Sequence, residues 1–270
     1  MKKRISTIIL ISIFVLGFLI LMYPATANWW NTRNQAKDIS NYQSVVQSVA
    51  KEDYSSYFAA ADAFNEKLLN MSTPLHNTKE LTEYEDVLNF PSTDIMAYIV
   101  IDRLKVELPI YHGTSNAVLS SGVGHVEGSS VPVGGPGTHC ALSAHRGLPS
   151  SKLFSDLDEM EVGDTFTITV LDRLLTYQVD QVKVVLPEEM DDLKIEPDKD
   201  YVTLVTCTPY GVNTHRLLVR GHRIENAEAE IEIYVPNEAI KVDPMIVAPI
   251  ISIPLILLVL IAVAIKYRKK

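Results

Sequence analysis

Three residues in the second half of the chain have side chains that can do covalent chemistry together. Cys207 closes the strand-like run TLVTC, a Thr-Pro-Tyr-Gly turn follows, and Arg216 stands near the start of the next run. His145 ends an earlier run, THCALSAH. A thiol attacks as its thiolate, which a nearby base or cation favours, and a fixed cation can also stabilise the oxyanion of a tetrahedral intermediate. The set predicts nucleophilic acyl transfer, with Cys207 as nucleophile, His145 as acid and base, and Arg216 as the cation.

The second cysteine, Cys140, raises the question of a disulfide. Side chains alternate between the two faces of a strand, so Cys140 points away from the face on which His145 would meet Cys207. Burial in a core explains Cys140 as a small apolar side chain. A Cys140–Cys207 disulfide stays open as the alternative, because a β-bulge can break the alternation and an even cysteine count outside the cell favours pairing.

A metal site is another competing interpretation of these residues. The possible zinc ligands are His139, Cys140, His145, Cys207 and His215. Their spacing matches neither paired CxxC nor HExxH, and strand alternation divides them between two faces. The glycine-rich stretch at 134–137 lacks the GK[ST] sequence that phosphate binding needs. We therefore expect neither a metal nor a cofactor.

Short strands between turn signals must position these side chains. The candidate strands cover residues 96–101, 106–113, 138–145, 164–171, 174–187, 201–208 and 215–224. Many short strands at irregular spacing, with few helices, are typical of a closed or nearly closed β-barrel. Short helical inserts are expected near 114–121 and at 151–160.

The segment before the expected barrel differs from it in composition and in predicted secondary structure. Residues 38–70 have spaced apolar positions and contain neither proline nor glycine, which predicts one or two amphipathic helices. Residues 71–95 contain two prolines and many turn-forming residues, which predicts a loop.

Two apolar stretches near the ends of the chain indicate the compartment. Residues 5–22 and 245–265 are uncharged and long enough to cross a bilayer as helices. Basic clusters lie on the outer flank of each stretch, at residues 2–4 and 266–270. The positive-inside rule then places both termini in the cytoplasm and the intervening domain outside.

The first apolar stretch also has a second interpretation. Ala25-Thr26-Ala27 resembles a signal-peptidase site, so the segment could be a cleaved signal peptide. The length of the apolar stretch and the Trp29-Trp30 pair, which is typical of a membrane interface, favour an uncleaved anchor. The domain faces outward in either case.

The charge outside the two basic clusters is strongly acidic. Those clusters hold seven of the 24 lysines and arginines, which leaves 17 basic residues against 33 acidic ones. Such a surface argues against binding nucleic acid and against docking on anionic lipid. The residues between the two apolar stretches are enough for one domain with a substantial core.

One stretch, TLVTCTPYGVNTHRLLVRG at 203–221, carries a specific family resemblance. Together with LPIYHGT (108–114), GVGHVEGSSVPVGGPGTH (122–139) and SAHRGLPSSKLFSDLD (143–158), it resembles the sortases, and more narrowly the class C, pilus-assembling sortases of Gram-positive bacteria. The likeness runs from about residue 96 to residue 224. It implies an eight-stranded sortase-type β-barrel, with Cys207 as nucleophile, His145 as general acid and base, and Arg216 as the oxyanion-binding or substrate-orienting residue.

The resemblance also implies a reaction and partners. Cys207 would attack the Thr–Gly bond of an LPXTG-like sorting signal, and His145 would protonate the departing amine to leave a thioester. A lysine amine of a second pilin would then form an isopeptide bond. The implied partners are pilin or surface-protein substrates and the membrane. The alternative is a sortase that attaches surface proteins to cell-wall peptidoglycan; a non-enzymatic, two-anchor surface receptor is a third interpretation, which the three reactive residues disfavour.

The loop before the barrel departs from the family pattern. Class C sortases usually have a lid there with an Asp-Pro-aromatic tripeptide, whereas NMSTPLHN (70–77) offers Thr73, Pro74 and Leu75. These three residues, together with Thr206 beside the nucleophile, are the candidate lid and substrate-binding residues. Because the acidic and aromatic groups are missing, we expect weaker self-occlusion of the thiol than is typical of the class.

The expected organisation has six parts. They are an N-terminal membrane anchor (1–27), a helical region (28–70), a lid loop (71–95), the catalytic barrel (96–232), a tether (233–244), and a C-terminal transmembrane helix with a basic cytoplasmic tail (245–270).

Overall fold

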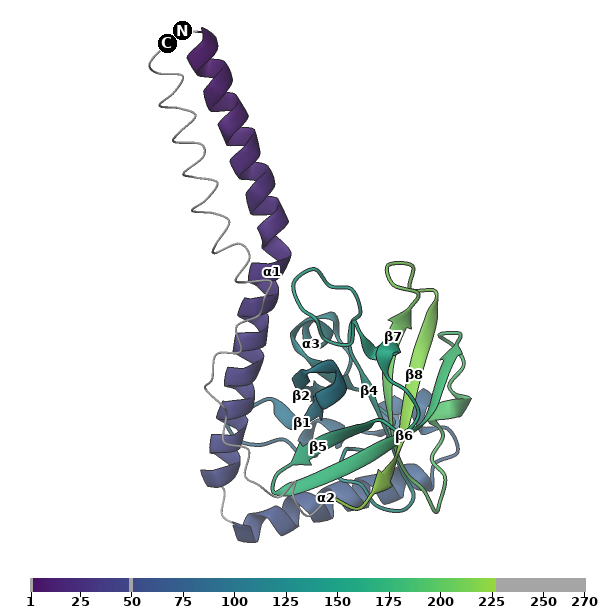
Figure 1. The fold of residues 1–270 in the computed structure, drawn as a ribbon. Helices are drawn as coiled ribbons and strands as arrows, with labels where there is room; N and C mark the ends of the chain where they lie inside the picture. The colour runs from purple at the N-terminus through teal and green to yellow at the C-terminus, as the bar shows by residue number, and fades with distance from the viewer. Residues whose placement is uncertain (1, 49–50, 227–270) are drawn as a thin grey trace.

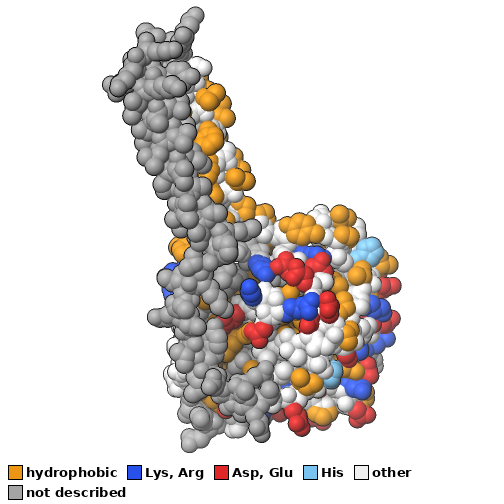
Figure 2. All heavy atoms as spheres, in the orientation of Figure 1, with side chains coloured by type: hydrophobic (Ala, Val, Ile, Leu, Met, Phe, Trp, Pro, Cys, Tyr) orange, Lys and Arg blue, Asp and Glu red, His pale blue; other side chains and the backbone are white. Residues whose placement is uncertain are grey.

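The structure of the protein is a computed structural model that describes residues 2–48 and 51–226. Its first element, α1 (Lys2–Ser48), is a single helix that contains Pro24 and whose N-terminal part stands clear of the barrel (Figure 1). By length and composition, α1 is the one helix within the described ranges that could cross a membrane. Its apolar side chains are exposed there, as Figure 2 shows in orange. The expected tether (233–244) and the expected second span (245–265) lie outside the described residues.

Eight strands form a closed barrel, which confirms the predicted fold class. They are β1 (Ile95–Ile101), β2 (Val106–His112), β3 (Val123–His125), β4 (Thr138–Ser143), β5 (Thr165–Val170), β6 (Arg173–Val185), β7 (Asp200–Thr208) and β8 (His215–Ile224). Their order around the barrel is β1-β2-β3-β4-β7-β8-β6-β5. In β5, Phe166, Ile168 and Val170 are buried and the residues between them are not. This is the period-2 pattern by which the sequence indicates a strand with one face in a core.

The arrangement of β4, β7 and β8 brings distant parts of the chain together. β4 pairs in parallel with β7, with His139 opposite Tyr201 and Ser143 opposite Val205. β7 pairs in antiparallel fashion with β8 across the turn at 209–214. A parallel pair needs a long crossover, which β5, β6 and residues 186–199 provide here. The C-terminal ends of β4 and β7 therefore meet at one end of the barrel.

Two helices cover the outside of the barrel. α2 (Lys51–Leu69) crosses one end of it, and the C-terminal half of α1 runs along β1 and β2 (Figure 1). Tyr42 of α1 is fully buried, and its hydroxyl accepts a hydrogen bond from the Leu171 N–H at 2.9 Å. Phe64 and Leu68 of α2 belong to the same core. Each such side chain contributes roughly 1.5–3 kcal/mol on burial, which holds both helices to the barrel.

The remaining elements are short. α3 (Asn116–Ser121) lies where a helical insert is expected, and the Ser115 hydroxyl caps it by accepting a hydrogen bond from the Val118 N–H. The 3-10 helices are η1 (Pro74–His76), η2 (Thr78–Glu80), η3 (Tyr84–Asp86), η4 (Asp102–Leu104), η5 (Leu157–Glu159) and η6 (Asp191–Leu193). η5 is all the helix that forms in the expected insert at 151–160, and η1 to η3 give local order to the expected loop at 71–95.

Candidate active site

Cys207 and Arg216 face each other across β7 and β8. The register of the two strands pairs them directly. Directly opposed residues of an antiparallel pair project to the same face, with Cβ atoms about 5 Å apart. Both residues are half-buried. Arg216 Nη1 donates to the carbonyl oxygens of His215 at 3.1 Å and Asn213 at 3.4 Å, which holds the guanidinium at the β7–β8 turn.

His145 lies just beyond the last paired residues of β4 and β7. The register ends at Ser143 opposite Val205, and the Thr206 hydroxyl then donates to the Ala144 carbonyl at 2.8 Å. If the β4–β7 register is continued past Ser143, His145 falls opposite Cys207. The start of the loop after β4, which contains His145, therefore lies at the same end of the barrel as Cys207 and Arg216.

Arg146 ties the loop that contains His145 to the β7–β8 turn. Its guanidinium is largely buried and forms an ion pair with Asp158. Nη1 donates to the Thr208 hydroxyl at 3.2 Å, and Nε donates to the Ser155 carbonyl at 3.1 Å. The planar guanidinium offers several fixed donors at once, which suits it to hold several segments. Arg146 directly follows His145, and it thereby binds Thr208, which directly follows Cys207.

Helix α1 holds the same loop from its other side. The Asn28 side-chain oxygen accepts a hydrogen bond from the Lys152 N–H at 2.8 Å, and Asn31 Nδ2 donates to the Ser150 carbonyl at 2.9 Å. The two asparagines are three positions apart and so share a helix face. Arg146 and this asparagine pair were missed by sequence reasoning. The available signals were the position of the arginine beside His145 and the spacing of the asparagines.

Thr206, a candidate substrate-binding residue, points away from the reactive face. Its side chain is buried, and strand alternation puts it on the side of β7 opposite to Cys207. The hydrogen bond from its hydroxyl to the Ala144 carbonyl links the ends of β4 and β7. This placement fits a residue that positions His145 and Cys207 rather than one that contacts a substrate.

The structure excludes the disulfide that the sequence left open. Cys140 and Cys207 are both free. Cys140 pairs with Val202 in the β4–β7 ladder and is buried, and this burial raises the pKa of its thiol well above the ordinary value. Cys140 is therefore a core residue with little thiolate at neutral pH.

His139, another of the weighed metal ligands, is occupied within the protein. Its Nδ1–H donates to the Lys194 carbonyl at 2.9 Å, and its Nε2 lies 2.7 Å from the Thr203 hydroxyl. Burial lowers the pKa of the imidazole. His139 thus acts as a neutral hydrogen-bonding group that fixes the 190–195 segment on the outer side of β4 and β7.

The turn formed by Thr73, Pro74 and Leu75 packs on Gly128. A Cβ atom on Gly128 would come within 2.6 Å of the Pro74 carbonyl oxygen, and the φ of this glycine is +88°. Between this turn and residues 188–195 lies a cavity of about 420 Å³. Among the described residues that line it, none is a candidate catalytic residue. The turn thus contacts the 126–130 segment, and Cys207 stays half-exposed.

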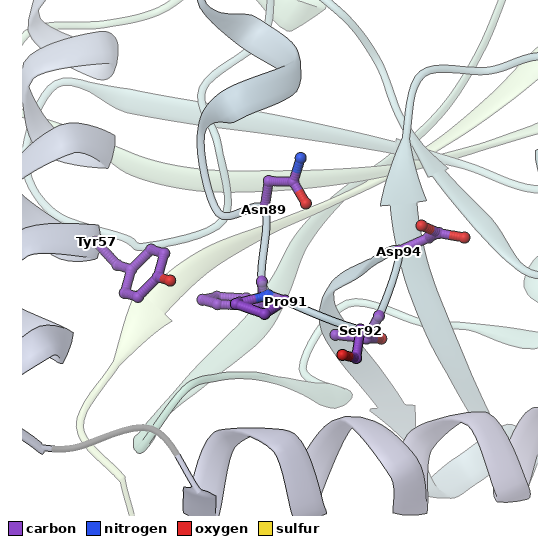
Figure 3. A pocket seen from close by; sticks show the side chains of 7 residues that line it. Tyr57, Asn89, Pro91, Ser92 and Asp94 are labelled. Atoms are coloured by element: carbon purple, nitrogen blue, oxygen red, sulfur yellow. The ribbon is translucent and has the colours of Figure 1, made fainter.

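A second hollow lies away from these residues. It is formed by residues 89–94 and Tyr57 of α2, as Figure 3 shows, and has a volume of about 490 Å³. Phe90 in its wall packs against Tyr42 with ring centroids 5.7 Å apart. This hollow belongs to the end of the barrel that α2 covers, and none of the described residues that line it is a candidate catalytic residue.

A buried histidine lies beneath η3. His125 is fully buried, its Nε2–H donates to the Ser130 carbonyl at 2.9 Å, and the Tyr84 hydroxyl lies 2.9 Å from Nδ1. Burial is the main cause that lowers the pKa of His125 to about 4. The side chain is therefore a neutral structural group.

Comparison with known proteins relates this arrangement to one family. Residues 99–224 match the family model described as the sortase domain. The crystal structure of sortase C1 from Streptococcus agalactiae is 47% identical in sequence to this chain. The match covers 71% of this chain and 100% of the sortase C1 chain, with a TM-score of 0.66. Sortase C1 of GBS pilus island 1 is 38% identical, covers 72% of this chain and 94% of that chain, and has a TM-score of 0.66.

A curated relative is more distant. Sortase A of Streptococcus agalactiae serotype III (strain NEM316) is 30% identical over 137 residues, which are 50% of this chain and 55% of that protein. The match thus spans about half the length of this relative.

Proposed function

Because this chain belongs to the sortase family of cysteine transpeptidases, with class C sortases among its structural neighbours, we propose that it cleaves an LPXTG-like sorting signal and transfers the acyl fragment to an amine. Two observations carry the proposal. Cys207 lies directly opposite Arg216 in the β7–β8 pair, and the β4–β7 pairing ends at Ser143 and Val205, two residues before His145 and Cys207. These are the residue types that acyl transfer through a thioester requires.

Each of the three residues has one task in this proposal. Cys207 Sγ attacks the threonine carbonyl carbon of the sorting signal, and Arg216 stabilises the oxyanion that forms. His145 then donates a proton to the departing glycine amine as the Thr–Gly bond breaks. The product is a thioester on Cys207. An incoming amine attacks the thioester, gives its proton to His145 and releases the thiolate.

The amine in this proposal is a lysine side chain of a second pilin. The similarity to sortase C1 of a pilus island supports pili over attachment to peptidoglycan. We further propose that α1 anchors the enzyme in the membrane, that residues 245–265 form a second anchor, and that the barrel faces outward. A membrane-tethered enzyme and a membrane-tethered pilin share one surface, which raises their effective concentration.

The proposal is tested with the full chain and a labelled LPXTG peptide. Wild-type protein should form an acyl adduct whose mass maps to Cys207 and which hydroxylamine releases as a hydroxamate. Cys207→Ala and His145→Ala should form none, and Cys140→Ala should behave as wild type. Incubation with the candidate pilin should then give a covalent, SDS-resistant ladder. An adduct on Cys140, or an adduct that survives Cys207→Ala, would refute the assignment.

A further inference from the structure

The tip of the β7–β8 turn is apolar and exposed. Tyr210 is 62% exposed and Val212 is 64% exposed, which leaves two large apolar side chains in water. From Thr208 to Thr214 the turn contains no charged residue, although the chain as a whole has a net charge of −9. The turn therefore presents two large apolar side chains and no charge to its surroundings.

The turn lies beside the loop that follows His145. A Cβ atom on Gly147 would come within 2.9 Å of the Tyr210 ring, and the Arg146 guanidinium carbon lies 6.0 Å from the centroid of that ring. The same loop is bound through Ser150 and Lys152 to Asn31 and Asn28 of α1, as described above. These contacts place the turn near the level of residues 28–31 along α1.

Residues 28–31 of α1 include an exposed tryptophan pair. Trp29 is 47% exposed and Trp30 is 59% exposed, and both lie about two helical turns beyond the apolar stretch 5–22. The Arg33 guanidinium carbon lies 5.8 Å from the centroid of the Trp29 ring. Tryptophan with a nearby basic residue at the end of an apolar helix is typical of the membrane–water interface. If α1 spans the membrane, this stretch lies at the interface.

We propose that the β7–β8 turn, through Tyr210 and Val212, rests in the headgroup region of the outer leaflet. The proposal depends on the membrane anchoring proposed above. In Figure 1 the turn and the loop after β4 lie at the end of the barrel that is nearest the N-terminal half of α1. Figure 2 shows hydrophobic side chains along that same edge. The barrel would then contact the lipid directly through the turn, in addition to its helical anchors.

This contact fixes the orientation of the reactive end. Helical anchors leave a domain free to tilt relative to the bilayer, whereas a direct contact between the barrel and the lipid removes much of that freedom. Cys207 and Arg216 flank the turn directly, so both would lie a few residues from the lipid surface. A sorting signal that emerges from the same leaflet would enter the site at that edge.

Measurement of depth in the membrane tests the proposal. The full chain with Cys207→Ala, which removes the accessible thiol, receives Val212→Cys and a nitroxide label and is reconstituted into phosphatidylglycerol–phosphatidylcholine vesicles. Collisions of the label with oxygen, which partitions into lipid, and with a water-soluble nickel chelate are measured. Because this background has no nucleophile, the result does not depend on the proposed activity.

A control position calibrates the measurement. Asp172 is exposed and follows Leu171, whose N–H is bonded to Tyr42, fourteen positions beyond Asn28 on α1. At 1.5 Å per residue this level lies about 21 Å farther from the membrane. Asp172→Cys in the same background therefore places the label in water.

The label at 212 should meet the nickel chelate roughly fivefold less often than the label at 172, and should meet oxygen at least as often as that label does. Equal nickel access at both positions would overturn the proposal. Low access to both probes at 212 would also overturn it, because a protein partner rather than lipid would then cover the turn.

Discussion

Cys207 and Arg216 are direct partners in the antiparallel β7–β8 ladder. Their proximity is thus set by the backbone register of two long strands. A slip of one residue would send the guanidinium to the opposite face of β8. Thr206, the neighbour of Cys207, bonds the carbonyl of Ala144, the neighbour of His145. Cys207 and Arg216 therefore lie on paired strands, whereas His145 and Arg146 lie in the loop that follows β4.

Removal of the Arg216 guanidinium should reduce acyl transfer strongly. Arg216→Ala should lower kcat/KM for a sorting-signal peptide by roughly 100- to 1,000-fold, the effect of losing one oxyanion donor. Arg216→Lys should recover only part of the loss, because an ammonium lacks the planar set of donors. Arg220→Gln is the matched control, since Arg220 lies on the same strand but is held by Asp180. Equal losses for Arg216→Ala and Arg220→Gln would show that strand stability, not oxyanion binding, is measured.

Arg146 should act on catalysis by positioning its neighbours. In Arg146→Gln the loop with His145 loses its bonds to Thr208 and Asp158. We expect kcat to fall roughly 10- to 100-fold with KM little changed, because misplacement of a catalytic group affects the chemical step. Arg103→Gln is the control, because Arg103 also forms ion pairs, with Glu161 and Asp164, but on an exposed surface. An unchanged kcat in Arg146→Gln would contradict the role.

The barrel could be predicted from the sequence because most strands are long enough to display their alternation. The run at 164–171 is an example, and Phe166 and Ile168 lie inside the barrel as its pattern indicates. β3 could not be predicted in this way, because three residues at 123–125 are too few to show a period. Its place between β2 and β4 depends on pairing partners that are distant in sequence.

The candidate site was predictable to a similar degree. The turn between Cys207 and Arg216 is short, so their proximity follows from local hairpin geometry. The bonds of Asn28 and Asn31 to the 150–152 loop join residues more than 100 positions apart, and a single sequence shows no pattern for such a contact. The Arg146 contacts likewise depend on where three segments meet.

The two cysteines should differ sharply in reactivity. Burial raises the pKa of Cys140, so native protein treated with iodoacetamide at neutral pH should gain one adduct, on Cys207. Cys140 should react only after unfolding, which peptide mass mapping with and without denaturant will show. Cys140→Ser should lower the free energy of unfolding by roughly 1–3 kcal/mol, because a hydroxyl is placed in an apolar core. Native alkylation of Cys140 at a rate close to that of Cys207 would disprove this view.

The stability of the fold should depend on pH through His125. Its pKa is about 4 in the folded protein, mainly because of burial, and about 6.5 in an unfolded chain. Above pH 6.5 neither state binds the proton and stability is complete. As pH falls from 6.5 to 4, the unfolded state binds a proton that the folded state excludes, so the free energy of unfolding should drop by roughly 3 kcal/mol.

Urea unfolding of wild type and His125→Gln across this pH range isolates the effect. The variant should be less stable at pH 7.5 and should lack this part of the acid-induced loss. Other groups also titrate: the pKa of buried His139 is lowered as well, and burial raises the pKa of Asp200. These contributions are common to both proteins and cancel in the difference. If the free energy of unfolding changed equally with pH in both proteins, His125 would not contribute to the pH dependence.

The turn at 73–75 should shield the nucleophile only weakly. It packs on Gly128 and beside residues 188–195, and it offers neither a carboxylate to pair with Arg216 nor an aromatic ring to cover Cys207. Deletion of residues 71–80 should therefore change the alkylation rate of Cys207 by no more than about threefold. Gly128→Ala is the milder variant, since its Cβ would collide with the Pro74 carbonyl and displace the turn while leaving it present. Both variants should keep the rate near that of wild type, measured at one pH with the folded state checked by circular dichroism. If Cys207 reacts much faster in both variants than in wild type, the turn must cover the thiol in solution. One variant removes the turn and the other displaces it, so the loss of that cover is the only change that the two have in common.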